Sequence, residues 1–186
     1  MKRVIIVHGW GGTPESDWFP WLKEELNDRG YRVIVPLMPE TDEPKIEPWI
    51  KKLREAVGEP DAETIFIGHS IGCQTILRYL QTAAGNAKET FFVAGWFNLI
   101  LDNIEEKEIA APWFATPINL EAAKEKAGKI TAIFSDDDPY VPHSDWEKFK
   151  TLLGAEVIIL KKRGHICEDD GAAELPEILK IIDNIV

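Results

Sequence analysis

This 186-residue sequence has few cysteines and no long apolar run. Its two cysteines, Cys73 and Cys167, are too few for a disulfide framework, so we expect reduced thiols and a cytoplasmic protein, with one bridge between them left open. No run approaches the ~18 apolar residues of a membrane span. The apolar run at residues 4–7 is too short for a signal peptide and no cleavage site follows it, so we predict no export.

Positive charge is also scarce, because 21 Lys and Arg stand against 32 Asp and Glu for a net charge of −11. An acidic surface repels phosphate backbones and anionic lipid, so we expect neither nucleic acid nor a membrane as a partner. Apolar residues make up 45% of the chain, which is enough for a full core. The length suits one domain over residues 1–186, and nothing in the sequence indicates the oligomeric state.

Short apolar runs alternate with segments of helical periodicity along the chain. The predicted strands are residues 4–7, 31–36, 64–68, 90–94, 130–134 and 157–160. The predicted helices are residues 18–29, 47–57, 71–81, 119–127 and 144–153; residues 95–117 are expected to be irregular and aromatic, and residues 172–185 close the chain. Strands separated by helices imply parallel pairing through right-handed crossovers. We therefore predict an α/β fold, a three-layer α/β/α arrangement with a doubly wound, mainly parallel sheet of about six strands. Its site should lie at the carboxyl ends of the strands.

A nucleophile motif follows the third predicted strand, and reads Gly68-His69-Ser70-Ile71-Gly72. The G-x-S-x-G pattern between a strand and a helix forms a sharp turn that projects the serine hydroxyl above the sheet, and glycines relieve the crowding there. The helix that begins at the turn directs its first N–H groups at the site. We predict Ser70 as the nucleophile and the Ile71 N–H as an oxyanion donor. The alternative is a Gly-rich turn whose serine only caps a helix.

A serine hydroxyl needs a base, and that base is usually an oriented histidine. The chain has four histidines, at His8, His69, His143 and His165. Only His165, just beyond the last predicted strand, satisfies the chain order of nucleophile, acid and base. We predict His165 as the base, and the alternative is a histidine in a surface loop.

The acid is expected in the loop after the fifth predicted strand, which contains Asp136, Asp137 and Asp138. Pro139 biases Asp138 to an extended conformation and fixes the turn. We predict that Asp138 holds the tautomer of His165, whereas Asp136 and Asp137 are solvated or brace the loop. The alternative is an acidic turn or a weak cation site.

The loop after the first predicted strand ends at the same sheet edge and reads Gly9-Trp10-Gly11-Gly12. A second oxyanion donor normally comes from this loop, so we predict the backbone N–H of Trp10. The loop lacks both the Gly-Lys-Ser/Thr ending of a P-loop and a full G-x-G-x-x-G, which argues against a nucleotide site.

Two tryptophans, Trp96 and Trp113, fall in the aromatic segment after the fourth predicted strand. They are candidates for a substrate-binding wall around an acyl group. The alternative, which is favoured for any one of them, is that they cover the sheet as part of the core.

Together these motifs resemble the small serine hydrolases of the retinoblastoma-binding protein 9 / YdeN-like family. The resemblance covers nearly the whole chain and rests on residues 18–22, 64–72, 137–142 and 164–165. It implies a reduced α/β-hydrolase fold without a large cap domain and a triad of Ser70, Asp138 and His165. The L-x-C-x-E motif is absent around both cysteines, so we do not expect a retinoblastoma-type partner.

We therefore expect a serine hydrolase of the esterase or acyl-hydrolase type. It would act on a small ester, thioester or amide through an acyl-enzyme, with a small-molecule acyl substrate and no cofactor or metal. Two alternatives stay open: a non-catalytic binding or scaffold protein on a hydrolase core, and an acyltransferase on the same fold. The sequence does not identify the substrate or its chain length.

Overall fold

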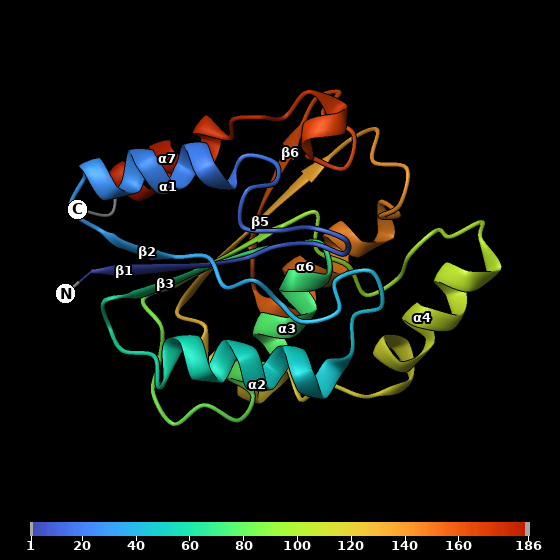
Figure 1. Ribbon diagram of the computed structural model, residues 1–186, viewed down its shortest axis with the longest axis horizontal. Coiled ribbons are helices and arrows are strands. Elements are labelled where there is room, and N and C mark those ends of the chain that lie inside the picture. Colours follow the sequence, from blue (N-terminus) through green and yellow to red (C-terminus); the bar gives the residue numbers. More distant parts are fainter. Residues whose placement is uncertain (1, 185–186) are drawn as a thin grey trace.

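The computed structural model describes residues 2–184 and has helices on both faces of one six-stranded sheet (Figure 1). The strands are β1 (Arg3–Val7), β2 (Arg32–Ile34), β3 (Thr64–His69), β4 (Glu89–Val93), β5 (Lys129–Ser135) and β6 (Glu156–Leu160). The helices are α1 (Phe19–Asp28), α2 (Ile46–Val57), α3 (Ile71–Leu80), α4 (Ile104–Ala115), α5 (Leu120–Lys126), α6 (Ser144–Leu153) and α7 (Pro176–Asp183), with a 3₁₀ turn at Glu168–Asp170. Residue 185, the end of the predicted closing segment, lies outside the described residues. Among those described, no helix has both the length and the apolar character needed to cross a bilayer.

The strands are all parallel and lie in the order β2-β1-β3-β4-β5-β6, which confirms the predicted doubly wound sheet. From β1 the chain moves to one edge of the sheet, and from β3 it moves strand by strand to the other. The order therefore reverses between β1 and β3. In open α/β sheets, such a reversal leaves a crevice beyond the carboxyl ends of the strands, where ligands bind.

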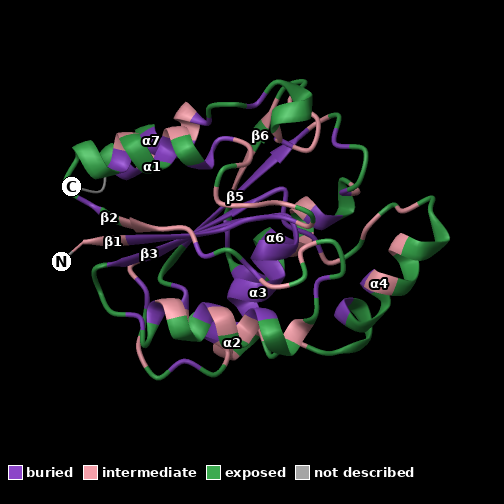
Figure 2. Cartoon of the chain, viewed as in Figure 1, coloured by how far each residue is buried: buried purple, intermediate pink, exposed green. Residues whose placement is uncertain are grey.

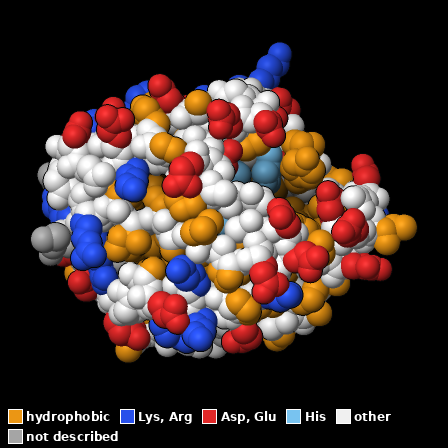
Figure 3. All heavy atoms as spheres, viewed as in Figure 1, with side chains coloured by type: hydrophobic (Ala, Val, Ile, Leu, Met, Phe, Trp, Pro, Cys, Tyr) orange, Lys and Arg blue, Asp and Glu red, His pale blue; other side chains and the backbone are white. Residues whose placement is uncertain are grey.

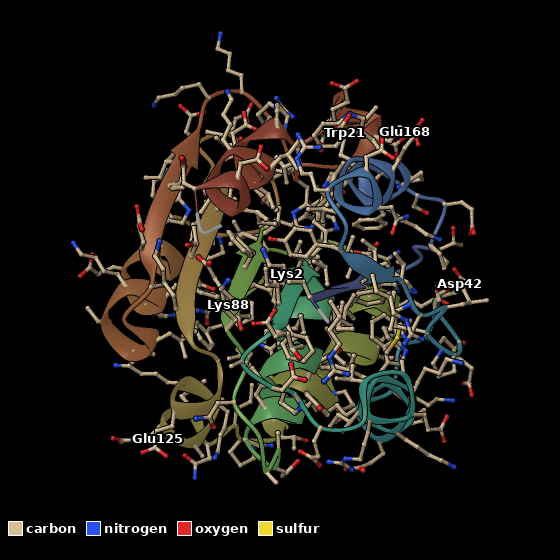
Figure 4. The ribbon with its side chains drawn as sticks, turned by 90° about the vertical axis from the view of Figure 1, so that its left-hand side faces the viewer. Lys2, Trp21, Asp42, Lys88, Glu125 and Glu168 are labelled. Carbon is tan, nitrogen blue, oxygen red and sulfur yellow. The ribbon has the colours of Figure 1, made fainter. Side chains whose placement is uncertain are left out.

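Alternating strand residues build two separate cores on the two faces of the sheet. Ile5 and Val7 of β1 belong to the core under α2, α3 and α6, whereas Val4 and Ile6 belong to the core under α1 and α7. Figure 4 views the layers from the side, with α1 on one side of the sheet and α2 on the other. In Figure 2 the central strands are buried throughout, as expected for parallel strands covered on both faces.

One segment differs from its prediction: residues 95–117, expected to be irregular, contain the 12-residue helix α4. The Asn103 side chain accepts the N–H of Glu105 and caps the first turn of this helix. Its apolar residues follow no single stripe, and Ile104 is exposed. Pro112 lies inside the helix, where proline is usually a breaker. Periodicity therefore gave no helical signal here. In Figure 1, α4 stands out from the body at the end that carries the carboxyl ends of the strands.

The buried Arg78 of α3 holds the C-terminal end of α4. The Arg78 guanidinium donates from Nη2 to the carbonyl oxygens of Trp113, at 2.7 Å, and Thr116, at 2.8 Å. The indole of Trp113 donates to the carbonyl oxygen of Pro44 at 2.9 Å. Burial lowers the pKa of Arg78. Its guanidinium donates to carbonyl groups at the end of α4, which lack a partner within the helix. These bonds fix where α4 lies against the rest of the fold.

Candidate active site

Ser70 occupies the turn between β3 and α3 with φ 51° and ψ −119°. A positive φ is uncommon for a residue other than glycine and stores strain. The turn is held on both sides, because the Ser70 N–H donates to the Val93 carbonyl at 2.9 Å and the Ser70 carbonyl accepts the Cys73 N–H at 3.0 Å. The strand–turn–helix geometry expected of the motif is present.

The two glycines of the motif allow this turn to approach its neighbours. A Cβ on Gly72 would lie 2.2 Å from the carbonyl oxygen of Val7, and one on Gly68 would lie 2.9 Å from the backbone of Cys73. Both distances are shorter than real Cβ contacts permit. The start of α3 therefore packs directly on the end of β1, which places Ser70 beside the loop after β1.

A cleft of about 590 Å³ opens over Ser70 at the carboxyl edge of the sheet. Ser70, His69 and His165 line it together with the glycine-rich loop after β1. The Ser70 side chain is 8% exposed, and its hydroxyl makes no hydrogen bond within residues 2–184. In the same range, no three His, Cys, Asp or Glu side chains are arranged to hold a metal ion.

Asp138 pairs with His165, which lines the cleft. Nδ1 of His165 lies 2.9 Å from Oδ2 and 3.1 Å from Oδ1 of the Asp138 carboxylate. Oδ1 also accepts the N–H groups of Tyr140, at 2.9 Å, and Val141, at 3.1 Å. A carboxylate only accepts, so Nδ1 carries the proton, and Nε2 has no partner in the described part of the chain. The imidazole is thus held in one tautomer with its basic nitrogen available.

The other two aspartates of this loop brace it against the loop after β6. Oδ1 of Asp137 accepts the Ser135 hydroxyl at 2.7 Å and the Gly164 N–H at 2.9 Å, and these bonds lower the pKa of Asp137. Asp136 pairs with Lys161 at 2.8 Å, which lowers the pKa of Asp136. Asp138 alone of the three contacts His165, and the other two join the loops that carry the pair.

Two histidines are remote from this chemistry. Nε2 of His8 accepts the Met38 N–H at 3.0 Å while Nδ1 donates to the Gly9 carbonyl at 2.8 Å, so the buried ring is neutral. Burial lowers the pKa of His8 accordingly. His143 is exposed and stacks on Trp146 with ring centroids 4.1 Å apart.

His69 lies under the loop that carries His165. Its Nε2 is 2.9 Å from the His165 carbonyl oxygen, and because a carbonyl only accepts, Nε2 carries the proton. The two rings lie 5.1 Å apart. Burial lowers the pKa of His69 to about 4, with the nearby His165 as a smaller cause in the same direction. His69 is therefore a neutral support for the loop, and it makes no hydrogen bond with the Ser70 hydroxyl within residues 2–184.

The start of α1 holds the same loop from a second direction. The indole N–H of Trp18 donates to the Ile166 carbonyl at 3.0 Å, and Oδ1 of Asp17 accepts the Glu168 N–H at 2.9 Å. Sequence reasoning missed both contacts, because they join residues about 150 positions apart. The positive φ of Asp17 marks this position as unusual, but it can be seen only in the folded chain and not in the sequence.

The predicted oxyanion donors are the backbone N–H groups of Trp10, which lines the cleft, and Ile71, which follows Ser70 at the start of α3. Neither donates to another group within residues 2–184. The Trp10 indole donates to the Asp42 carbonyl at 2.9 Å, and the Gly11 N–H donates to the Thr41 carbonyl at 2.8 Å. These bonds fix the loop after β1 to the loop after β2.

Trp96 and Trp113 do not reach the cleft. They are 1% and 2% exposed and belong to the core under α2 and α3. The structure therefore replaces the expected tryptophan wall with the core alternative. Other residues of the same segment, Leu99, Leu101 and Ile109, line the cleft instead.

The serine hydrolase family profile matches residues 4–184 of the chain. YdeN of Bacillus subtilis strain 168 is 28% identical over 97% of this chain and 94% of its own length. The serine hydrolase RBBP9 of Rattus norvegicus is 25% identical over 99% of this chain and 95% of its own. The crystal structure of the B. subtilis ydeN gene product superposes with a TM-score of 0.90 at 25% identity, covering 99% of this chain and 98% of the other.

Proposed function

The chain belongs to the serine hydrolase family, and we propose that it hydrolyses small esters, thioesters or amides through an acyl-enzyme on Ser70. The observation that carries this proposal is the contact of Asp138 with His165, a histidine that lines the same cleft as Ser70. A hydrolase function is common to the family and to RBBP9, and the acyl-transfer mechanism is our inference from the site.

In the first half of the reaction, Nε2 of His165 takes the proton of Ser70 as Oγ attacks the acyl carbonyl carbon. The Asp138 carboxylate holds the ring and stabilises the imidazolium that forms. The N–H groups of Trp10 and Ile71 donate to the carbonyl oxygen as it becomes an oxyanion, and the first turn of α3 adds its positive end.

The tetrahedral intermediate then breaks the bond to the leaving group. The His165 imidazolium returns its proton to the leaving oxygen, sulfur or nitrogen, and the acyl group stays on Oγ as an ester. A water molecule then gives its proton to Nε2 and attacks the ester carbonyl. Collapse of the second intermediate releases the carboxylic acid and returns the proton to Ser70.

The size and lining of the cleft suit a small substrate. Its volume of about 590 Å³ lies within the range of small-molecule sites. Leu99, Leu101 and Ile109 give one apolar side against which a short acyl chain would pack. The acyl part of the substrate would lie there while the N–H groups of Trp10 and Ile71 hold its carbonyl oxygen.

A fluorophosphonate probe tests the proposal, since it reacts covalently with an activated serine. We expect labelling of the wild type, loss of labelling in Ser70→Ala, and the same loss of p-nitrophenyl butyrate hydrolysis. Ser16→Ala is the matched control, because Ser16 lines the same cleft and should leave labelling intact. An unlabelled wild type, or equal labelling of Ser70→Ala, would reject the serine nucleophile.

A further inference from the structure

The cleft over Ser70 is lined by acidic side chains, and we propose that it selects substrates that carry a positively charged amine. This inference rests on the proposed function and names its substrate class. The acidic lining residues are Asp17, Asp42, Glu105, Glu106 and Asp169. Among the described residues that line the cleft, none is Lys or Arg. In Figure 3, acidic side chains gather around the opening where a histidine is visible. A cleft of one sign concentrates ligands of the opposite charge.

Some of these carboxylates have another role in the fold. Glu105 and Glu106 lie in the first turn of α4, where negative charge stabilises the helix dipole. The acidic lining therefore sets the sign of the field but does not by itself locate a ligand. Asp17, which belongs to no helix or strand, supplies the location.

Asp17 presents one carboxylate oxygen without a partner. Its φ of 55° lies in the left-handed region, and its side chain is 15% exposed. Oδ1 accepts the Glu168 N–H, while Oδ2 makes no hydrogen bond within residues 2–184. The strained backbone thus turns one oxygen toward the loop after β6 and leaves the other at the cleft.

A polar atom of His69 close to that free oxygen is also an unpartnered acceptor. Nδ1 of His69 lies 3.9 Å from Oδ2 of Asp17, and the His69 side chain is only 4% exposed. Because Nε2 carries the proton that bonds the His165 carbonyl, Nδ1 has only a lone pair to offer, and it finds no donor in the described part of the chain. A buried acceptor without a donor is costly, so Nδ1 of His69 favours a donor placed between it and Oδ2 of Asp17. An ammonium group has three donors and a compensating charge.

The space beside these two atoms reaches the nucleophile. Gly9 lies next to them, and a Cβ at Gly9 would be 2.9 Å from Nδ1 of His69 and 3.5 Å from Cβ of Ser70. Because Gly9 has no side chain, this residue adds no atoms between Nδ1 of His69 and Ser70. An amine a few bonds from the reacting carbonyl, on the acyl or the leaving-group side, would therefore reach Asp17 and His69.

Two pairs of isosteric esters test the inference and distinguish the two sides. In the first pair, the p-nitrophenyl esters of glycine and propionate differ by an ammonium in place of a methyl on the acyl side. In the second, 4-(aminomethyl)phenyl and 4-ethylphenyl acetate differ in the same way on the leaving group. The preference is the ratio of kcat/KM within a pair, corrected by the ratio of the uncatalysed rates. We expect a preference of roughly tenfold or more for the amine in at least one pair, since hydrogen bonds to a charged group are strong.

Asp17→Asn should remove most of that preference. Asparagine tolerates the left-handed backbone and keeps an oxygen for the Glu168 N–H, so the change removes the charge alone. Asp28→Asn is the matched control, because Asp28 is exposed at the end of α1 and does not line the cleft. We expect its preference to equal that of the wild type.

The outcomes separate this inference from the proposed function. Hydrolysis of the neutral esters without any preference for the amine would overturn the inference and leave the hydrolase mechanism standing. A preference that survives in Asp17→Asn would also overturn it, because another carboxylate of the cleft would then bind the amine. Absence of both hydrolysis and fluorophosphonate labelling would overturn the proposed function and this inference with it.

Discussion

Nδ1 of His165 lies 2.9 Å from Oδ2 of Asp138, and two backbone N–H groups hold the other oxygen of the same carboxylate. The carboxylate is therefore fixed before it orients the imidazole. Any group that replaces it must still accept two N–H bonds from the turn and the proton of Nδ1. An amide can meet the first requirement but fails the second when its NH₂ faces the ring.

Asp138→Asn should therefore retain the fold and lose most of the activity. The asparagine oxygen can still accept the N–H groups of Tyr140 and Val141, while the NH₂ group favours the wrong tautomer of His165. We expect kcat to fall by about 10⁴, as for equivalent changes in Ser-His-Asp triads. Steady-state hydrolysis of a p-nitrophenyl ester measures the loss, and circular dichroism checks the fold.

Asp136→Asn is the control for that change. Asp136 lies two residues away and contacts Lys161 and the Lys162 N–H rather than His165. We expect less than about a tenfold loss, because solvent screens the ion pair of Asp136 with Lys161 and neither residue contacts His165. Equal losses in the two variants would show that Asp138 acts only by shaping the loop.

The parts of the fold that have a strong local pattern could be predicted from sequence. The strand runs, the G-x-S-x-G turn and the choice of Asp138 by its following Pro139 all depend on residues close together in the chain. Helix α4 could not be predicted, because its apolar residues form no stripe and Pro112 lies within it. The cap by Asn103 was its one local signal. Its position depends on Arg78, which lies on another helix.

The support of His165 was beyond sequence reasoning for the same reason. Trp18 is buried in the core, and its indole N–H also donates to the Ile166 carbonyl. The contact of His69 with the His165 carbonyl appears once β3 and β6 are placed in one sheet. A pattern within one segment carries no information about such pairs.

Gly72→Ala should destabilise the protein strongly. A Cβ there would lie 2.2 Å from the Val7 carbonyl oxygen, and neither backbone can move without disrupting α3 or β1. We expect a loss of about 3 kcal/mol or more in the free energy of unfolding, beyond the usual range for overpacking by one methyl group. Urea denaturation measures it as a lower midpoint, or as failure to fold.

Gly30→Ala separates steric overlap from backbone strain. Gly30 has φ +80° but nothing within 4 Å of a new Cβ, so only the left-handed conformation is penalised, by roughly 1–2 kcal/mol. If Gly72→Ala proved as stable as Gly30→Ala, α3 would not lie this close to β1.

Stability should decrease as the pH falls from about 6.5 to about 4, in part because of His69. Burial lowers the folded-state pKa of His69 to about 4, whereas an unfolded histidine titrates near 6.5. Between these values the unfolded chain binds the proton and the folded chain does not, so the stabilisation present above pH 6.5 is lost toward pH 4. Urea midpoints measured at half-unit steps of pH test the slope.

His69→Gln should reduce that slope, since glutamine can keep a donor for the His165 carbonyl but does not titrate. Part of the slope should persist, because burial lowers the pKa of His8 in the same direction. His143→Gln is the control and should leave the slope unchanged, as His143 is exposed. A slope that is identical in His69→Gln and the wild type would contradict a neutral, buried His69.

Arg78→Met should loosen α4 and weaken substrate binding while leaving the nucleophile turn intact. Methionine fills much of the buried volume but leaves the carbonyls of Trp113 and Thr116 without donors, at a cost of about 1–3 kcal/mol. Ile109 of α4 lines the cleft, so KM should rise more than kcat falls.

Hydrogen exchange should accelerate in α4 and not in α3 of Arg78→Met. Arg54→Met is the control, because Arg54 is exposed on α2 and its side chain donates only to the Thr82 hydroxyl among residues 2–184. If exchange in α4 were equally slow in both variants, the anchor would have to be the contact of Trp113 with Pro44 rather than Arg78.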